Sequence, residues 1–238
     1  MAALYDIHGN LPALEAVLTE VDREGVDAIV CGGDLLWGPM PAECLDVLLG
    51  RKTLFIRGNA DRDAVAGEDE IDRYCSARLG AAEKARVADW PLTLELDLPG
   101  SGRVLFCHAT PRSDEEIVTR DTPDEAVAEA LADIEAALVV CGHTHVQFDR
   151  RPPGSPRLVN AGSVGMPYEG DPAARWALLG KKLEFRRTTY DVEDAISAIL
   201  HTGMPQAERI VVNALQGGVD PEEAVSFFES QRANPHGA

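Results

Sequence analysis

His143 and His145, two histidines separated by a single residue, stand in the stretch Cys-Gly-His-Thr-His at positions 141–145. The apolar run 138–140 that precedes them is typical of a buried strand. Imidazoles on a tight turn at a strand end can each present a nitrogen to one of two neighbouring positions, which suits a pair of metal ions. Taken alone, a His-x-His sequence is equally well explained by a surface loop.

Other metal-type side chains follow apolar runs upstream. The sequence has six histidines, and four of them stand immediately after such runs, beside Asp, Asn or Gly. In chain order the groups are Asp6 with His8, Gly33-Asp34, Gly58-Asn59, His108, and His143 with His145. This repetition at strand ends is not the pattern of histidines scattered over a solvated surface.

The chemistry of these side chains suits cations that share ligands. Side chains alternate faces along a strand, so we expect Asp6 and His8 to point the same way and to share one cation. Asp34 follows a glycine pair, and its two carboxylate oxygens can each bind a different ion. Asn59 offers a neutral amide oxygen, although Gly58-Asn59 by itself also predicts an ordinary turn.

Composition limits the classes of partner. The 238 residues include 40 acidic and 22 basic side chains, and the formal net charge is −18. Such a charge repels nucleic acid and anionic membranes, so neither a long nucleic acid nor a membrane is expected as a partner. A polyanionic substrate therefore requires a local positive centre, which bound metal would supply.

Cysteine usage and hydropathy predict a cytoplasmic protein. The five cysteines lack C-x-x-C spacing, and three of them end apolar runs, which favours small buried thiols in a reducing compartment. No apolar run approaches the ~20 residues that a membrane span needs, and no signal-peptide pattern opens the sequence.

Hydrophobic spacing predicts one large α/β unit whose first half repeats strand, turn and helix. Asn10 is expected to cap a helix that ends at Gly25, with Pro12 in its first turn. Strands are predicted at 2–5, 28–31, 54–56, 92–98, 104–107, 138–140 and 158–159, and a hairpin is predicted from 176–179 and 183–185.

Helices are predicted at 41–49, as one or two helices within 64–89, and at 126–136. The last of these is expected to begin with a capping box at 122–125, Thr-Pro-Asp-Glu. Three further helices are predicted at 191–200, 205–215 and 221–231, separated by Gly203 and by Gly217-Gly218. These three lack metal-type groups, and His201 and His236 are interpreted as surface residues.

The ordered groups resemble the motifs of the calcineurin-like metallophosphoesterase superfamily, and the strings at 6–10, 33–39 and 160–165 resemble its bacterial phosphodiesterase and diadenosine-polyphosphatase-like branch. The resemblance covers Ala2 to about Tyr190. It implies the fold class α/β, as a four-layer α/β/β/α sandwich of two stacked mixed sheets flanked by helices. Residues 1–190 would form the metallophosphoesterase domain. Residues 191–238 would form a helical extension, packed on the domain or at a subunit interface of a homo-oligomer.

The resemblance also implies how ligands divide between two divalent ions. One ion would be held by Asp6, His8, Asp34 and His145, and the other by Asp34, Asn59, His108 and His143. Oxygen and imidazole ligands suit manganese, our first expectation, and equally iron, zinc or nickel. In the implied mechanism a hydroxide shared by the ions attacks phosphorus in line, with Asp34, Asn59 and His143 as the candidate catalytic residues.

One position departs from the family pattern, because Ala60 stands where many members carry a histidine that protonates the leaving group. Loss of a general acid commonly costs ~10²–10⁴-fold and is felt most with alkoxide leaving groups. We therefore expect hydrolysis of phosphodiesters or nucleotide polyphosphates. The alternatives are a phosphomonoesterase acting on nucleotides or phosphoproteins, and a catalytically weak regulatory scaffold.

A small phosphorylated substrate, such as a nucleotide, requires contacts beyond the metals. Arg57, Arg62 and Arg112 stand near the motif loops and are candidates to meet phosphate, although solvated or structural arginines would explain them equally well. Tyr168 and Trp37 are candidates to stack on a base, with packing at the rim of the sheet as the alternative. Asp61, beside Asn59, is expected to orient His143 or His108.

Overall fold

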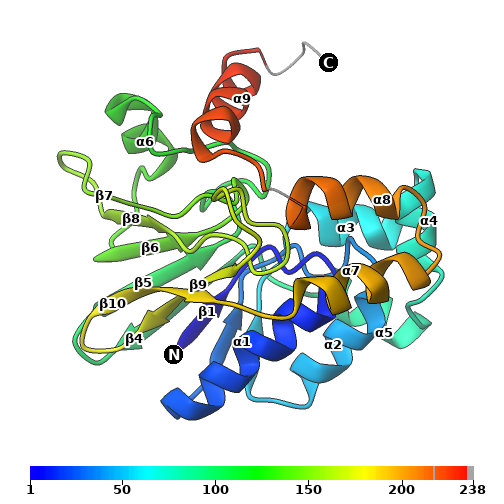
Figure 1. Ribbon diagram of the computed structural model, residues 1–238. Coiled ribbons are helices and arrows are strands. Elements are labelled where there is room, and N and C mark those ends of the chain that lie inside the picture. Colours follow the sequence, from blue (N-terminus) through cyan, green and yellow to red (C-terminus); the bar gives the residue numbers. More distant parts are fainter. Residues whose placement is uncertain (217, 235–238) are drawn as a thin grey trace.

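The computed structural model describes residues 1–216 and 218–234. It contains two five-stranded mixed sheets (Figure 1). The first sheet has the order β10 (Leu183–Thr188), β9 (Ala174–Leu179), β1 (Ala2–Leu4), β2 (Ile29–Cys31) and β3 (Thr53–Phe55). The second has the order β4 (Thr93–Leu98), β5 (Gly102–Cys107), β6 (Leu138–Cys141), β8 (Arg157–Asn160) and β7 (Phe148–Arg150).

The central strands of both sheets are parallel. In the first sheet β1, β2 and β3 run parallel, with Ala3 opposite Val30 and Val30 opposite Leu54. In the second sheet β5, β6 and β8 run parallel, with Phe106 opposite Val140. Because parallel neighbours end at the same edge of a sheet, the loops that follow β1, β2, β3, β5 and β6 are brought together.

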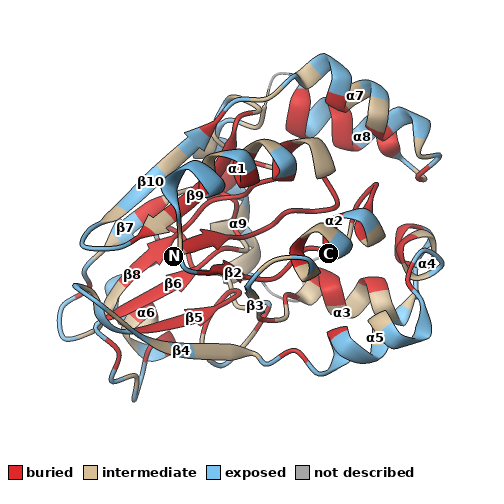
Figure 2. Cartoon of the chain, turned by 90° about the horizontal axis from the view of Figure 1, so that it is seen from below, coloured by how far each residue is buried: buried red, intermediate tan, exposed pale blue. Residues whose placement is uncertain are grey.

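The two sheets stack face to face, and the residues between them are almost entirely buried (Figure 2). Apolar side chains of both sheets meet in this layer, among them Val30, Val104, Phe106 and Val140. Tyr5 lies in the same layer, and its hydroxyl donates a hydrogen bond to the carbonyl oxygen of Val140 at 2.8 Å. A phenol buried among apolar residues needs such a partner, and here the bond joins the end of one sheet to the other.

Helices cover the outer faces of the two sheets, as the fold class α/β/β/α requires. The first sheet is covered by α1 (Leu11–Glu24), α2 (Pro41–Leu49) and α7 (Val192–His201), whose apolar residues share one core cluster with β1 and β2. The second sheet is covered by α6 (Asp124–Ala130). Asn10 caps α1 by accepting a hydrogen bond from the backbone N–H of Ala13, and Gly25 ends the helix in the left-handed conformation, as predicted.

The region 59–88 contains three short helices, where one or two starting at residue 64 were predicted. They are α3 (Asn59–Ala66), α4 (Glu70–Ser76) and α5 (Ala81–Ala88). Gly67 ends α3 with a φ of 71°, and the carboxylate of Asp69 caps α4 by accepting from the N–H of Asp72. The helical spacing was therefore interpreted correctly, but the signals that interrupt it at Gly67 and Asp69 were missed.

The predicted capping box at 122–125 is wrong. No side-chain bond caps α6, and the helix ends at Ala130 instead of residue 136. The Thr122 hydroxyl is used elsewhere, since it accepts from the N–H of Thr119 at 2.9 Å and donates to the carboxylate of Glu229. A contact with a distant helix has thus displaced the local cap. Strand β7 was also not predicted.

The C-terminal part contains α7, α8 (Ala207–Ile210), a π-helical turn (Val211–Leu215) and α9 (Pro221–Ala233). Ile199, Ile210 and Leu215 belong to the same core cluster as α1 and α2, so α7, α8 and the π-helical turn pack on the first sheet's helices. In Figure 1, α9 lies apart from these helices and near α6. Gly217 and His236 lie outside the described residues, and the boundary at 190 stays a prediction.

Candidate metal centre

The predicted ligands occupy loops at the shared edge of the two sheets, and most of them have an unusual backbone conformation. Asp6, His8, Asp34, His143 and His145 all have positive φ, between 47° and 68°. We expected Asp6 and His8 to point the same way because side chains alternate along a strand. That reason is wrong, because β1 ends at Leu4 and neither residue lies in a strand. The turn is held instead by backbone bonds from Asp6 N to Gly33 O at 3.1 Å and from His8 N to Asp34 O at 2.9 Å.

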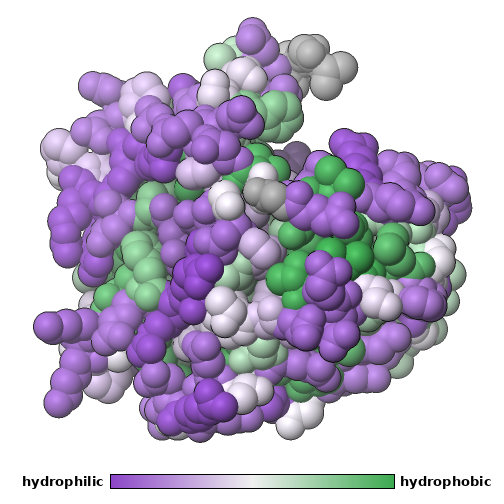
Figure 3. Space-filling view, viewed as in Figure 1, coloured by the Kyte–Doolittle hydropathy of each residue, from purple (hydrophilic) through white to green (hydrophobic). Residues whose placement is uncertain are grey.

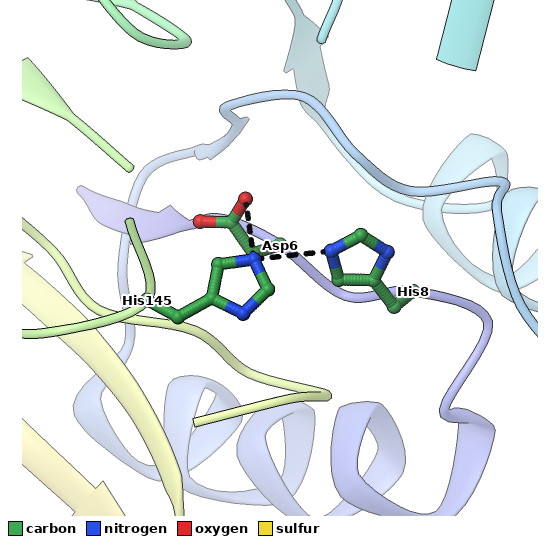
Figure 4. Close-up of side chains that lie close together, drawn as sticks. All are labelled: Asp6, His8 and His145. Carbon is green, nitrogen blue, oxygen red and sulfur yellow. Dashed lines mark hydrogen bonds and ion pairs between the residues drawn. The ribbon is translucent and has the colours of Figure 1, made fainter. Parts of the chain in front are cut away.

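One group of ligand-type atoms is formed by Asp6, His8 and His145 (Figure 4). Nε2 of His145 lies 3.4 Å from Oδ1 of Asp6 and 3.2 Å from Nε2 of His8. All three side chains are buried, and their candidate ligand atoms lie within 4.8 Å of one another. Such a set can surround a single small cation.

A second group is formed by Asp34, His108 and His143. Nε2 of His108 lies 3.3 Å from Oδ2 of Asp34, and the same oxygen lies 3.8 Å from Nε2 of His8. Asp34 therefore stands between the two groups. Its other oxygen, Oδ1, accepts a hydrogen bond from the N–H of Ala60 at 2.8 Å, which fixes the orientation of the carboxylate.

The hydrogen bonds of the histidines leave one nitrogen of each ring turned toward the carboxylates. Nδ1 of His8, His108 and His145 lies 3.0, 3.0 and 2.7 Å from a backbone carbonyl oxygen. Nε2 of His143 lies 3.1 Å from the carbonyl oxygen of Glu115. A carbonyl accepts only from an N–H, so in the neutral ring the opposite nitrogen carries a lone pair that faces the site.

This donor set fits two cations. The lone pairs of His8 and His145 face each other at 3.2 Å beside the carboxylate of Asp6, an arrangement that repels itself without a positive charge between the atoms. The side-chain amide of Asn59 adds an atom 3.3 Å from Nε2 of His108 and 3.2 Å from Nδ1 of His143. With its oxygen turned there, Asn59 would add a further ligand atom, and this role stays a prediction.

The pKa shifts show the same demand for positive charge. Burial alone would lower the pKa of His108, but the charges of Asp34 and Asp6 outweigh it and raise this pKa to about 10. At neutral pH Nε2 of His108 therefore carries a proton, and this proton lies on the side of the ring that would face a metal ion. Burial and the charge of His108 lower the pKa of His143 to about 4, so the second ring of this group stays neutral.

Glycines bring the backbone of these loops close to the carboxylates. A Cβ at Gly58 would overlap Oδ1 of Asp34, and a Cβ at Gly142 would overlap Oδ2 of Asp6. The backbone N–H of His143 donates to Oδ2 of Asp6 at 3.0 Å through this close approach. The motif glycines are therefore required by the packing of the loops.

Asp61 has different hydrogen-bond partners from those expected. The side chain is fully buried, and its carboxylate accepts bonds of 2.9 to 3.0 Å from the backbone N–H groups of Asp34, Leu35, Leu36 and Gly58. Burial and the charge of Asp34 raise the pKa of the Asp61 carboxyl to about 7. Asp61 thus connects the loop after β2 to the start of α3, and its hydrogen bonds do not go to His143 or His108.

A cavity of about 460 Å³ opens from the ligand groups. The predicted residues that line it are His8, Asp34, Trp37, Asn59, His143, His145 and Tyr168, together with Ala60. Residues not predicted also line it: Asp69, Ile71, Met166, Gln206, Arg209, Ile210, Asn213 and Phe228. The space-filling view shows a notch between α9 and the α8 region, with apolar residues at its sides (Figure 3).

The three arginines proposed as phosphate contacts do not line this cavity, and each is paired with carboxylates. Arg57 and Arg62 lie 3.4 and 3.0 Å from oxygens of Asp114. Arg112 donates to Glu116 at 2.9 Å. Their part in substrate binding stays a prediction, and the cavity presents Arg209 instead. Arg209 stands in a C-terminal helix whose sequence carries no motif. Sequence reasoning therefore had no signal by which to select it.

The fold and the site together define a class of protein, the metal-dependent phosphoesterases. The family model of the calcineurin-like phosphoesterase superfamily domain matches residues 1–180, and the chain belongs to this superfamily. The match includes all seven predicted metal ligands, whereas the C-terminal residues of the cavity wall lie beyond it.

The relatives are similar over nearly their full length. A metallophosphoesterase from Sphaerobacter thermophilus is 25% identical, with a TM-score of 0.75 and coverage of 92% of this chain and 99% of that one. A hypothetical protein from Pyrococcus horikoshii is 22% identical, with a TM-score of 0.77 and the same coverage. An uncharacterized protein of Methanocaldococcus jannaschii is 28% identical over 236 residues, covering 87% of this chain and 94% of that protein.

Membrane insertion has no candidate helix. Within residues 1–216 and 218–234, none of the helices combines the length and the apolar character that crossing a bilayer requires.

Proposed function

We propose that this protein is a hydrolase of phosphodiester or nucleotide-polyphosphate bonds that uses two divalent ions, with manganese as the first candidate. The observation that carries the proposal is the placement of Asp34 between two groups of ligand atoms, buried except for the half-buried His143, that open into one cavity. Two ions held there would bind phosphate oxygens and lower the pKa of a bound water toward neutrality.

The chain's own residues prepare the site for this chemistry. Asp34 is held by the N–H of Ala60, and the histidine rings are fixed by backbone carbonyls, so the ligand atoms are in place before substrate binds. Ser163 is not a nucleophile in this proposal. Its hydroxyl is fully buried, donates to the carbonyl oxygen of Asp6 at 2.7 Å and accepts from the N–H of Met166.

The leaving group is expected to be one that needs no proton from the protein. Ala60 lines the cavity at the position where a histidine donor would stand in many relatives, and its methyl group cannot supply a proton. Asp69, also at the cavity wall, is engaged in capping α4. The leaving groups of activated diesters and phosphoanhydrides are weakly basic oxygens. These substrates therefore suit the site better than alkyl monoesters.

Hydrolysis of bis-(4-nitrophenyl) phosphate tests this proposal. The protein is treated with chelator, reconstituted with Mn²⁺ and compared with Asp34→Asn, which removes the carboxylate charge between the two groups. Turnover should appear with the metal and fall to the background rate in the variant. Asp133→Asn makes the same change at an exposed loop and should retain wild-type turnover.

Two outcomes contradict the proposal. If 4-nitrophenyl phosphate is turned over faster than the diester, the protein is a phosphomonoesterase. If two metal ions bind and neither ester nor diadenosine tetraphosphate is hydrolysed, the chain is a metal-binding scaffold.

A further inference from the structure

The C-terminal helices complete the cavity above the metal groups. Gln206, Arg209, Ile210 and Asn213 come from α8, its cap and the π-helical turn, and Phe228 comes from α9. All five lie beyond residue 180, where the match to the family model ends. The family's part of the chain thus supplies the metal ligands, and the extension supplies the wall that a bound substrate would meet.

Arg209 brings a positive charge into this wall. Within the described residues the one hydrogen bond of its guanidinium goes to Oε1 of Gln206 at 3.5 Å, and no ion pair joins it to a carboxylate. Arg57, Arg62 and Arg112, by contrast, are all paired with acids. An unpaired guanidinium at a cavity wall, in a chain of net charge −18, is available for an anionic ligand.

The backbone around Arg209 is anchored by neighbouring residues that are buried in the core. Ile210, Val211, Ala214 and Leu215 are buried in the core cluster, which leaves Arg209 and Asn213 on the exposed side. The two residues are four apart, and the π-helical turn begins between them. Single π-helical turns are frequent at functional sites because they redirect side chains within a helix.

An aromatic wall stands next to the metal ligands. The Tyr168 ring lies 4.6 Å from that of His145 and 6.4 Å from that of Phe228, and the Phe228 ring lies 6.3 Å from that of His143. Arg209 and Tyr168 line the same cavity. Aromatic faces and a guanidinium therefore share one cavity with the metal groups.

We infer that the substrate is a nucleotide with at least two consecutive phosphates, in which Arg209 binds the phosphate next to the one attacked and Tyr168 and Phe228 contact the base. The inference rests on the proposed function. A cavity of about 460 Å³ is of the size that small-molecule ligands occupy, and a phosphate alone would leave most of it empty.

The reaction that follows is hydrolysis of a phosphoanhydride bond. The oxygen of one water forms a bond to the attacked phosphorus, and the bridging P–O bond breaks with its electron pair on the leaving phosphate. The two protons of the water go to the product phosphates or to solvent according to pH. A phosphate leaving group is weakly basic, which agrees with Ala60 at the position of the missing acid.

The first test compares selectivity. The ratio of kcat/KM for diadenosine tetraphosphate to that for bis-(4-nitrophenyl) phosphate is measured for the wild type, Arg209→Gln and Arg209→Lys. The diester has no second phosphate, so the ratio should fall about tenfold or more in Arg209→Gln and less in Arg209→Lys. Arg151→Gln removes the same charge from an exposed loop after β7 and should leave the ratio at the wild-type value.

The second test measures binding without turnover. Isothermal titration of the Mn²⁺-loaded protein with adenosine 5′-(α,β-methylene)diphosphate should give a Kd about tenfold or more higher in Arg209→Gln than in the wild type. Methylenediphosphonate, which lacks the base, should bind more weakly than the nucleotide, and Phe228→Leu should reduce this difference.

The outcomes separate the two proposals. Failure of the wild type to hydrolyse any of the esters would contradict the proposed function. The titration would still measure how much Arg209 contributes to binding of the nucleotide. If turnover is present and Arg209→Gln lowers kcat/KM equally for both substrates, or leaves the Kd of the nucleotide unchanged, the inference is wrong and the proposed function stands. Equal thermal unfolding of the variants excludes misfolding as the cause.

Discussion

Asp61 shows how one buried carboxylate can organise a metal site without contacting a ligand side chain. Its two oxygens accept hydrogen bonds from four backbone N–H groups on the loop after β2 and at the start of α3. The loop after β2 carries Asp34, and α3 begins at Asn59. The distance between a predicted carboxylate ligand and a predicted amide ligand is therefore set by a third residue.

Replacement of Asp61 by Asn should weaken both the fold and the site. The amide has one acceptor oxygen, so its N–H₂ group would face backbone donors that lose their acceptor. We expect the free energy of unfolding to fall by about 1–3 kcal/mol and the affinity for Mn²⁺ to fall roughly 10–100-fold. Urea unfolding and a metal titration measure the two effects.

Asp63→Asn provides the matched control, because Asp63 lies on the same helix with a partly exposed side chain. It should change neither quantity appreciably. Wild-type stability and metal affinity in Asp61→Asn would refute the organising role.

The sequence was informative at the residue scale wherever chemistry was encoded locally. The seven ligand candidates could be selected because each carries a metal-type side chain within a few residues of the end of an apolar run. The partners of Asp61 could not, because they are backbone groups whose positions depend on two turns. Nor could the free charge of Arg209, which depends on the three-dimensional arrangement that leaves it without an ion pair among the described residues.

Among the elements, α9 is attached to the segment 119–122 through hydrogen bonds of Glu229. Glu229 accepts hydrogen bonds from the hydroxyls of Thr119 and Thr122, the first at 2.7 Å, and from Nε of Arg232 at 2.7 Å. Burial would raise the pKa of Glu229, but these bonds outweigh it and lower the pKa below the ordinary value of a glutamate. The stabilisation is therefore present above the ordinary carboxyl range and is lost as the pH falls through the lowered pKa.

Glu229→Ala should loosen α9 at neutral pH. Amide hydrogens of residues 221–233 should exchange with solvent faster than in the wild type, whereas those of α1 should not change. Because α9 carries Phe228 to the cavity, the KM of a nucleotide substrate should rise more than kcat falls. Glu223→Ala, on the same helix, should change the exchange much less, and equal exchange in both variants would contradict this attachment.

Element prediction failed where a distant contact competed with a local signal. Thr122 has the sequence context of a helix cap, but its hydroxyl bonds to α9 more than 100 residues away, and α6 is correspondingly short. Helices with strong periodicity and caps, such as α1 and α7, were placed correctly.

For the whole molecule, the arrangement of charges makes metal and stability interdependent. In the folded chain the ring nitrogens of His8 and His145 face each other beside the carboxylate of Asp6, and the unfolded chain separates these groups. Metal that binds only the folded state therefore stabilises it. At a concentration 100 times its Kd, one ion contributes about 2.7 kcal/mol.

Thermal unfolding with Mn²⁺ and with chelator measures this interdependence. For a chain of this size we expect Mn²⁺ to raise Tm by about 5–10 °C per strongly bound ion relative to chelator. Asp34→Asn should lose much of the increase, since Asp34 faces both groups. Identical Tm values with metal and chelator would show that no ion binds the folded protein tightly.

The stacking of two sheets could be inferred from the family resemblance, but the cavity could not. Its outer wall is assembled from α8, the π-helical turn and α9, whose sequences carry no motif. Their apolar residues, such as Ile210 and Leu215, were equally compatible with a subunit interface. Only the fold shows that they pack on the helices of the first sheet.

The left-handed backbone of five predicted ligand residues has a consequence for protein engineering and for evolution. Residues other than glycine pay conformational strain in this region, of order 1–2 kcal/mol each, with less for Asp. Glycine would relieve the strain at any of these five positions while removing a ligand. A selection for thermal stability in a metal-free medium would place no requirement on keeping these ligands, so a thermostable library of this protein needs the metal present during selection.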